Sequence, residues 1–410
     1  MAKKVNLPEP IIPNDSWKVV KLGQYVKILN GYPFDSSRFT NSNENTYPLI
    51  RIRDVVRGYT ETFTDEDCPD EYKIKKGEIL IGMDGDFNIS RWKSDFGLLN
   101  QRVCKISTAS KDLDEKFLFY YLPIPLKLIN DATPSVTVKH LSSTSLQELH
   151  FPLPTLDEQQ RIVNRIESMF AKLDEAKEKA QNVVDGFETR KAAILHKAFT
   201  GELTAKWRKE NGVSDDSWVV KRLEECGKWE RGRSKHRPRN APELFGGKYP
   251  FIQTGDIANA DIYIYEHKQT LSEFGFQQSR LFPKDTLCIT IAANIGKVAI
   301  LTYDCCFPDS VVGFTPFENV DSKFMYYKIN DMQKDLEAMA PATAQKNLNL
   351  KLLTSVSVQI PTLPEQVEIV RILDIIIEKE NKAKQAAEAV LEQIDLLKKS
   401  ILVRAFRGEL

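Results

Sequence analysis

Two stretches of ten residues, PTLDEQQRIV at residues 154–163 and PTLPEQVEIV at residues 361–370, decide how this chain is organised. The second follows the first at an offset of 207 residues. The same offset relates KAAILHKAFTGEL at 191–203 to KKSILVRAFRGEL at 398–410. An internal repeat has to be recognised first, because it changes the interpretation of the whole fold. The 410 residues therefore consist of two copies of one unit.

The offset between the copies is smaller near their beginnings. The tripeptide DSW at residues 15–17 returns at residues 216–218 with an offset of 201. From Pro154 and Pro361 onward the offset is 207 and does not change. Insertions therefore accumulated in the first part of each copy, whereas the part that follows the two prolines tolerated none.

Apolar and small residues recur after both prolines with alternating spacings of four and three residues, which is typical of the seam of a coiled coil. Proline before and Gly201 or Gly408 after each run predict where a helix starts and stops. We expect two antiparallel helices of about 40 residues and about 60 Å that pack on each other. The alternative is that each helix packs separately on its own domain. The predicted seam consists of Ile162, Ile166, Met169, Leu173, Ala176, Ala180, Val183 and Phe187, and of Ile369, Leu373, Ile376, Ala383, Ala387, Val390 and Ile394.

The rest of each copy mixes strand and helix patterns. Runs such as YPLIRIRDVV, KKGEILIGM and QRVCKIS in the first copy, and YPFIQTGDI, DTLCITIA and KVAILTY in the second, are typical of β-strands between turn residues. Residues 114–121 and 322–339 are predicted helices. The expected fold class is α+β, with two globular domains separated by the helices and related by a pseudo-two-fold repeat. The predicted segments are a globular domain at 1–153, a central helical region at 154–207, a second globular domain at 208–360 and a C-terminal helical region at 361–410.

Composition and motifs exclude several classes of protein. No apolar run approaches the roughly 18 to 20 residues of a membrane span, and the first residues lack the apolar stretch of a secretory signal, so we expect a soluble, cytoplasmic protein. The six cysteines form no CxxC pair and the five histidines are dispersed, so no metal site is expected. The sequence also lacks a phosphate-binding P-loop, a GxGxxG turn and an HExxH helix. We therefore expect no catalytic residues in this chain.

The zero net charge is at first sight evidence against DNA binding, since DNA-binding domains are usually basic. It holds in each globular segment, with 20 basic and 20 acidic residues in 1–150 and 18 of each in 211–360. Locally, however, the nine residues RGRSKHRPR contain no acid. Arginine donors suit phosphates and guanine edges, and the alternative is a solvated basic loop. The candidate DNA-binding residues of this loop are Arg231, Arg233, Lys235, Arg237 and Arg239.

The first copy has a weaker set of basic residues, of which Arg38, Arg51, Arg53 and Arg91 are candidates for DNA binding. Asn100 and Gln101 suit adenine edges, although such residues are more often only turn residues. Lys139 in SVTVKHL and Lys346 in ATAQKNL stand at equivalent points of the two copies. A lysine there fits a phosphate contact or packing against the adjacent helix.

These motifs resemble the specificity subunits of type I restriction-modification systems. The resemblance rests on FPLPTLDEQQRIV and IPTLPEQVEIV, on KAFTGEL and RAFRGEL, and on the openings DSWKVVKLG and DSWVVKRLE. It also includes the segments YPLIRIRDV and YPFIQTGDI, and it covers the whole chain. The twofold occurrence of the Pro-x-Leu-x-Glu-Gln start followed by a long helix is highly specific.

The resemblance implies two target recognition domains, each of which reads one half of a bipartite, asymmetric DNA target. It further implies that the helices set the spacer and dock two methylation subunits, which bind S-adenosylmethionine and modify adenine. Restriction subunits would add ATP- and Mg-dependent translocation and cleavage, so this chain itself would hold no cofactor. Two alternatives stay open, namely a protein-binding coiled-coil scaffold without DNA readout and an enzyme that acts alone.

Overall fold

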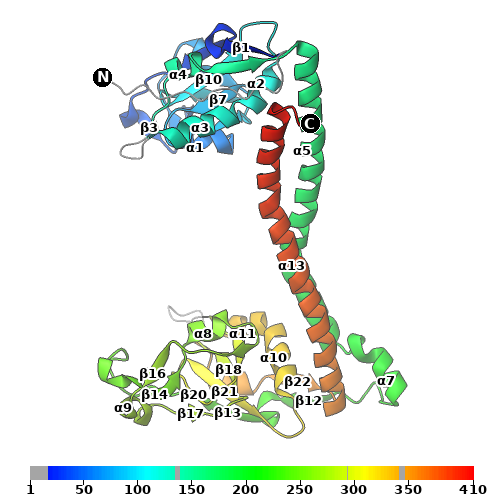
Figure 1. Cartoon of the computed structure of the whole chain (residues 1–410). Coiled ribbons are helices and arrows are strands. Elements are labelled where there is room, and N and C mark those ends of the chain that lie inside the picture. Colours follow the sequence, from blue (N-terminus) through cyan, green and yellow to red (C-terminus); the bar gives the residue numbers. More distant parts are fainter. Residues whose placement is uncertain (1–16, 134–138, 293, 341–346) are drawn as a thin grey trace. The chain divides into compact units, whose positions relative to one another are not determined.

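The computed structural model describes residues 17–133, 139–292, 294–340 and 347–410 (Figure 1). Its contacts divide the chain into two compact units, which we call unit 1 (residues 1–181 and 389–410) and unit 2 (residues 182–388). Each unit joins one globular domain to parts of both long helices. The units therefore cut across the four segments expected from the sequence, and each is described by itself.

Both units contain a sheet built in the same order. In unit 1 this antiparallel sheet runs β2 (Val26–Asn30), β10 (Val103–Thr108), β7 (Ile79–Gly82) and β8 (Ile89–Arg91). In unit 2 the equivalent order is β13 (Gly227–Arg231), β21 (Val311–Pro316), β18 (Leu287–Thr290) and β19 (Val298–Leu301), to which β15 (Tyr263–Ile264) adds in parallel. The α+β fold class expected from the sequence is confirmed.

The second sheet differs between the units. In unit 1 it runs β3 (Phe39–Thr40), β5 (Phe63–Thr64), β4 (Tyr47–Ile50), β9 (Phe96–Leu99) and β6 (Lys73–Lys75). In unit 2 it runs β16 (Gln269–Leu271), β14 (Phe245–Phe251), β20 (Cys305–Cys306) and β17 (Leu281–Phe282), with the short helix α9 (Glu273–Gln277) beside it. The insertions that change the offset between the copies fall in this region.

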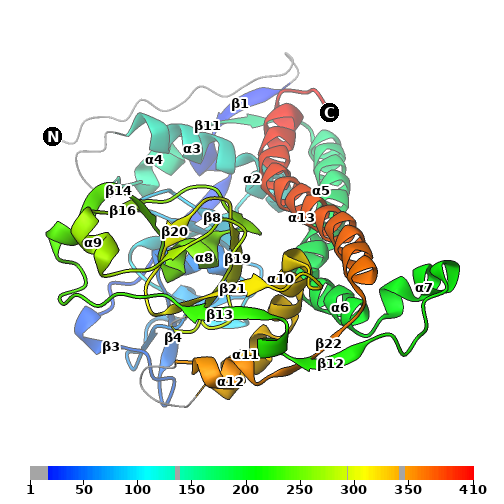
Figure 2. The same ribbon diagram turned by 90° about the horizontal axis from the view of Figure 1, so that it is seen from below.

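A third element is again common to both units. A two-stranded antiparallel pair joins the start of each globular domain to its end, β1 (Lys18–Lys21) with β11 (His150–Leu153) and β12 (Val219–Arg222) with β22 (Ser357–Ile360). Figure 2 shows β12 and β22 side by side. Short helices complete the domains: α2 (Glu115–Tyr121), α3 (Pro123–Ala132) and α4 (Ser143–Gln147) in unit 1, and α10 (Ser322–Asp331), α11 (Gln333–Met339) and α12 (Leu350–Thr354) in unit 2.

Two strand predictions were wrong in the same way. The run YPLIRIRDVV ends its strand at Ile50 and continues as α1 (Ile52–Arg57), and YPFIQTGDI continues as α8 (Thr254–Asn259). The cause is helix capping, because the carboxylates of Asp54 and Asp256 accept hydrogen bonds of 2.9 and 2.8 Å from backbone N–H groups three residues earlier. The alternating apolar pattern alone did not reveal these caps.

The two long helices start and end where the sequence predicts. The first starts at Leu156 and the second at Leu363, and they end at Phe199 and Phe406, two residues before glycines with positive φ. The second, α13 (Leu363–Phe406), is continuous. The first was expected to be continuous as well, but Gly186 divides it into α5 (Leu156–Asp185) and α6 (Phe187–Phe199). Glycine is a weak helix former, so the interruption falls at this residue.

The helices run antiparallel within each unit. In unit 1, Asp174 and Lys177 of α5 pair with Lys398 and Asp395 of α13. The residue numbers rise along one helix as they fall along the other. In unit 2, Arg190 of α6 pairs with Glu380 of α13 at 2.7 Å, and Phe187 lies under Lys384. Helix-on-helix packing is thus present in both units, and each helix also packs on a globular domain.

The predicted seam is displaced at two of its positions. Val390 is 40% exposed and Ala383 is exposed as well, whereas Leu391 and Lys384 are partly buried in their place. The shift by one residue follows from the 3.6-residue period of a helix, which drifts from an ideal heptad along its length. Eight of the remaining predicted positions are buried: Ile162, Ile166, Ala180, Phe187, Ile369, Leu373, Ala387 and Ile394. The other five, Met169, Leu173, Ala176, Val183 and Ile376, are partly buried, and Met169 and Leu173 pack against the unit 1 core.

The end of each long helix completes the core of a globular domain of the other copy. Phe406, from the second copy, packs on Phe117 of α2 with ring centroids 5.2 Å apart. Phe199, from the first copy, packs on Phe324 of α10 at 5.5 Å. All four rings are buried, with Phe199 the most exposed at 6%. The KAF and RAF motifs thus mark aromatic residues that hold helix and domain together.

The glutamine of the Pro-x-Leu-x-Glu-Gln motif has a structural role in both copies. The Gln159 amide donates to the carbonyls of Asp112 and Pro154 at 2.8 and 2.9 Å, and its Oε1 accepts from the N–H of Asp114 at 2.8 Å. Gln366 makes the three equivalent bonds in unit 2. Both side chains are fully buried. Each glutamine therefore ties the loop before a domain helix to the first turn of a long helix.

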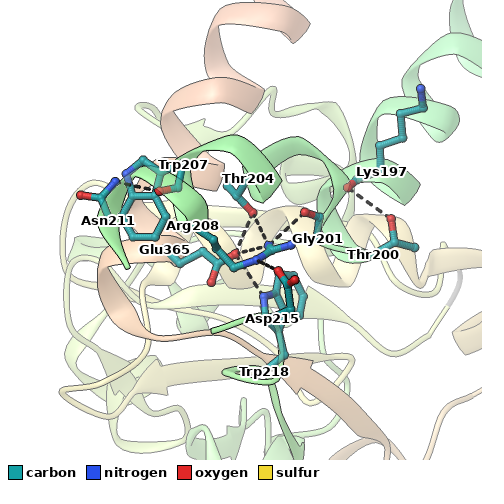
Figure 3. A network of polar contacts seen from close by, with 10 residues as sticks. All are labelled: Lys197, Thr200, Gly201, Thr204, Trp207, Arg208, Asn211, Asp215, Trp218 and Glu365. Carbon is teal, nitrogen blue, oxygen red and sulfur yellow. Dashed lines mark hydrogen bonds and ion pairs between the residues drawn. The ribbon is translucent and has the colours of Figure 1, made fainter. Parts of the chain in front are cut away.

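The neighbouring glutamate differs between the copies. Glu158 pairs with Arg161 at the surface at 2.8 Å, whereas Glu365 is fully buried. As Figure 3 shows, Glu365 Oε1 accepts from Arg208 at 2.7 Å, from Thr204 at 2.7 Å and from Trp218 at 3.1 Å. Arg208 lies on α7 (Ala205–Asn211), so this network fixes the segment after α6 to the first turn of α13.

The buried glutamine should matter far more than its exposed neighbour. Gln159→Ala removes three hydrogen bonds to backbone groups, one of them buried and two partly buried, and we expect a loss of about 2–4 kcal/mol in the free energy of unfolding. Gln160→Ala removes one exposed hydrogen bond to Asn164 and should cost less than about 0.5 kcal/mol. Urea denaturation followed by circular dichroism measures both. Similar losses for the two variants would contradict the assignment.

The two equivalent glutamates provide a matched pair. Glu365→Gln breaks a buried ion pair and leaves Arg208 with the exposed carboxylate of Asp215, 3.0 Å away, as its remaining ionic partner. We therefore expect a loss of about 3 kcal/mol. Glu158→Gln removes a surface pair and should cost at most about 1 kcal/mol. Tryptophan fluorescence during urea unfolding is a suitable probe, since Trp218 is a hydrogen-bond donor to Glu365. A cost for Glu365→Gln as small as that of its counterpart would show that the network does not stabilise unit 2.

Candidate nucleic-acid interface

In unit 2 the basic loop leaves the end of β13 and crosses the turn that precedes β21. The N–H of Gly232 donates to the carbonyl of Val311 at 2.9 Å, and that of Arg233 donates to the carbonyl of Phe307 at 3.1 Å. A Cβ atom on Gly232 would collide with the carbonyl oxygens of Phe307 and Pro308. Glycine is therefore required at this close approach of two backbones. The crossing holds the cations that follow it against the edge of the sheet.

Unit 1 contains the same crossing. Gly31 donates to the carbonyl of Val103 at 2.9 Å and the next residue, Tyr32, donates to that of Leu99 at 2.8 Å. A Cβ on Gly31 would collide with the carbonyl of Asn100. Asn100 and Gln101 thus stand where unit 2 has Pro308 and Asp309. Candidate residues predicted from the sequence thus lie at this crossing in both copies, but the sequence did not show that the two places are equivalent.

Most cations of the unit 2 loop are tethered. Arg231 donates through Nε to the carbonyl of Asp309, and Arg239 donates through Nη2 to its Oδ2 at 2.8 Å. Arg237 donates to the carbonyls of Ser234 and His236, both at 2.8 Å. The loop is therefore held in one conformation by its own arginines. Arg231, Lys235, Arg237 and Arg239 are nevertheless exposed, which fits a DNA-binding loop and a solvated basic loop equally.

Three other side chains of the loop have different surroundings. The Nε atom of Arg233 is buried and, within the described residues, has no hydrogen-bond partner. The side chain of Lys235 is exposed. The ring of His236 lies edge-on to Phe274 of α9, with 5.3 Å between the centroids, and Phe274 is 43% exposed. An exposed aromatic ring beside a basic loop is a suitable contact for a base or a thymine methyl group.

In unit 1 the structure brings Arg38, Arg51 and Arg53 together around the β3–β5 pair. Arg38 donates to Asp65 at 2.8 Å, and this bond lowers the pKa of the carboxyl group. The guanidinium of Arg51 lies 5.8 Å from the ring centroid of Phe39, and Arg53 donates to the hydroxyl of Thr62 at 2.9 Å. All three arginines are exposed, so their remaining donors face water.

Two of the predicted DNA-binding residues are only partly exposed and have internal partners. Arg91 donates to the carbonyl of Gly77 and to Glu115, at 2.8 and 2.7 Å. Lys139 donates to the backbone carbonyl and the side chain of Asn130, at 2.7 and 3.1 Å. Of the two roles considered for Lys139, packing against the adjacent helix is the one observed, because its ammonium group satisfies the last turns of α3. Lys346 lies outside the described residues.

Asp309 and Phe274 are functional candidates that the sequence analysis missed. Asp309 is 70 residues from Arg239 along the chain, and only the fold brings their side chains together. Phe274 stands in an unremarkable polar segment, FGFQQ. A signal was present only for the loop itself, in the form of Gly232 within an acid-free basic run.

Among the residues that the structure describes, the interface has no arrangement typical of a metal or thiol centre. In the described residues no group of three or more His, Cys, Asp or Glu side chains is placed to hold a metal ion. The cysteine side chains are all buried, and burial raises the pKa of Cys104 and Cys305 to about 12 and that of Cys306 to about 11. At neutral pH these thiols are therefore protonated and poor nucleophiles. No helix among the described residues has the length and apolar character needed to span a bilayer.

Two α+β domains, each joined to a long helix and each with polar side chains at the same backbone crossing, define a protein with tandem recognition domains. The chain belongs to the family of type I restriction-modification specificity proteins. It matches the family described as "Type I restriction modification DNA specificity domain" over residues 14–184 and 215–393, which is one match for each copy. The resemblance stated from the sequence motifs is thereby confirmed.

Named relatives and solved structures agree with this family. The chain is 31% identical to the EcoBI specificity subunit of Escherichia coli over 97% of its own length and 87% of the relative's. It is 24% identical to the MjaVIII specificity subunit of Methanocaldococcus jannaschii over 97% and 94%. The crystal structure of the HsdS subunit from Thermoanaerobacter tengcongensis covers 97% of this chain and 98% of that one, with a TM-score of 0.63 and 18% identity. A chain from a study of type I R-M complex assembly covers 98% and 100%, with a TM-score of 0.71 and 19% identity. These structures share the fold.

Proposed function

We propose that each unit reads one half of a bipartite, asymmetric DNA target and that the chain directs a type I restriction-modification complex to it. The observation that carries this proposal is the crossing of Gly31 and Gly232 over equivalent turns. One backbone arrangement presents different side chains in the two units. A reader built in this way would recognise two different half-sites.

The base-reading groups differ in chemistry between the units. Unit 2 offers arginines, which suit guanine O6 and N7, whereas unit 1 offers Gln101 at the crossing and exposed arginines near β3. Because neither globular segment is basic overall, non-specific attraction to the phosphates should be weak. The assembled complex would supply much of the affinity through its other subunits.

The long helices would set the distance between the half-sites and dock two methylation subunits. Each domain is fixed to its helix by the same clamp: Lys116 and Tyr120 contact Glu167 at 2.9 and 3.4 Å, and their counterparts Lys323 and Tyr327 both contact Asp374 at 2.6 Å. Burial, with the nearby carboxylate of Asp374, raises the pKa of Tyr327. On α13, the exposed Val367, Leu396 and Leu397 leave apolar surface for a partner.

The chemistry of the complex would lie in the partner subunits. Methylation subunits would bind S-adenosylmethionine and methylate adenine, and restriction subunits would use ATP and Mg for translocation and cleavage. This chain would select the DNA in the cytoplasm without a catalytic residue or cofactor of its own. Titration of labelled duplexes into the chain with its methylation subunit separates this function from a protein-binding scaffold, which would show no sequence preference.

The loop arginines should act on one half-site alone. Arg231→Ala or Arg233→Ala should cost about 1–3 kcal/mol of discrimination at the unit 2 half-site if the contact is bidentate to guanine, and nothing at the other. Lys228→Ala on β13 is a control outside the loop. Methylation mapping of the reconstituted complex measures both half-sites. A uniform loss of affinity for all duplexes would instead make these arginines phosphate contacts.

Helix length should determine the gap in the target. Deleting one heptad from each long helix, residues 174–180 and 381–387, removes about 10 Å of rod while keeping the spacing of the seam. We expect methylation mapping to show the same two half-sites with a shorter gap. An unchanged gap between the same half-sites would refute the idea that the helices act as a ruler.

A further inference from the structure

Asp309 lies in the turn between β20 and β21, at the point where the basic loop crosses it. Its carbonyl accepts from Arg231, the first residue of the loop, and its Oδ2 accepts from Arg239, the last, at 2.8 Å. A single residue thus holds both ends of the nine-residue basic loop. We propose that Asp309 is a positioning residue that determines the specificity of unit 2 through Arg239.

The environment of Asp309 supports a built contact rather than a chance surface pair. Its side chain is 31% exposed, and its other carboxylate oxygen, Oδ1, is buried without a hydrogen-bond partner within the described residues. Burying part of a carboxylate is unfavourable unless a cation compensates for it. Arg239, with 52% of its side chain exposed, provides this compensation and keeps donors in water.

Such an arrangement has two physical consequences for recognition. A loop held in its binding conformation loses less conformational entropy when DNA binds, so its contacts contribute more to affinity for the correct sequence. The negative charge of Asp309 also offsets one cation of the loop, which weakens attraction to any duplex regardless of sequence. Both effects increase discrimination.

The first copy provides an independent comparison. Gln101 occupies the equivalent turn position, is exposed, and follows Asn100, whose Oδ1 accepts from the Gln101 N–H at 2.7 Å. At the loop positions equivalent to Arg233 and Arg239, unit 1 has Tyr32 and Arg38, and Arg38 pairs with Asp65, which directly follows β5. A carboxylate in this turn is therefore not required by the shared fold. It accompanies the arginine loop of unit 2.

This inference rests on the proposed function, namely DNA reading by the unit 2 loop, and the test separates the two. Three substitutions are made in the full chain assembled with its methylation subunits: Asp309→Asn, which removes the charge but keeps an acceptor, Asp309→Glu, which keeps the charge but moves it, and Arg239→Ala. Glu230→Gln is the matched control, since it removes an acid on neighbouring β13 that pairs with Arg280. Competition binding compares the target duplex with duplexes scrambled at either half-site, at several salt concentrations.

We expect Asp309→Asn to lower discrimination at the unit 2 half-site by about tenfold and to strengthen binding to scrambled duplexes with a steeper salt dependence. Asp309→Glu should lower discrimination without the change in salt dependence. Neither should affect the unit 1 half-site. Because Asp309 acts through Arg239, Asp309→Asn should have little further effect on discrimination in the Arg239→Ala background.

Three results would overturn the proposal. One is an effect of Glu230→Gln equal to that of Asp309→Asn, which would show a general charge effect. Another is that Asp309→Asn lowers discrimination by the same factor in the Arg239→Ala background as in the unchanged chain, which would show that Asp309 does not act through Arg239. The third is full discrimination with Asp309→Glu. If Arg239→Ala and the other loop arginine variants all keep full discrimination, the proposed reading by this loop is itself wrong. Thermal unfolding of each variant confirms that it is folded before binding is compared.

Discussion

The packing of one copy's helix end into the other copy's domain is the constraint on which the rest of the structure depends. Phe406 completes the core around Phe117, and Phe199 completes the core around Phe324. Burying a phenylalanine side chain contributes about 1.5–3 kcal/mol, so neither domain retains its full stability without the other copy's helix. This exchange also explains why the helical parts tolerated no insertion. One added residue would rotate the aromatic ring away from its pocket by about 100°.

The same constraint fixes the part of each domain that packs on the long helices and leaves the rest of the domain free to diverge. The second sheets differ in strand order and length, while the clamps at Glu167 and Asp374 and the amides of Gln159 and Gln366 are repeated in both copies. The crossing at Gly31 and Gly232 lies where the constant part meets the variable one. Backbone hydrogen bonds hold it in both units, so its side chains are free to change. Variation of recognition therefore does not require variation of the scaffold.

Much of this fold was predictable from the sequence because it follows local and periodic rules. Helix starts, glycine ends and the α+β class follow from spacing and turn residues. The helices at α1 and α8 were missed because a single capping carboxylate, Asp54 or Asp256, overrides an alternating pattern. Of the candidate site, the basic loop was visible in the sequence. Its partner Asp309 was not, since a contact across 70 residues leaves no periodic signal. Likewise, nothing in the sequence distinguishes Arg91, which pairs with Glu115 in the same domain, from Arg51, which is exposed to water.

The zero net charge can now be understood at the level of single contacts. In the unit 2 loop, one acid from a distant turn and several backbone carbonyls accept hydrogen bonds from Arg231, Arg237 and Arg239 before any DNA is present. A nucleic acid must therefore offer better acceptors in the right geometry to replace or extend these bonds. Every DNA sequence offers phosphates, but only some sequences place a guanine edge in line with an arginine that is held in position. A reader in which most arginines already have partners gains specificity at the expense of general affinity.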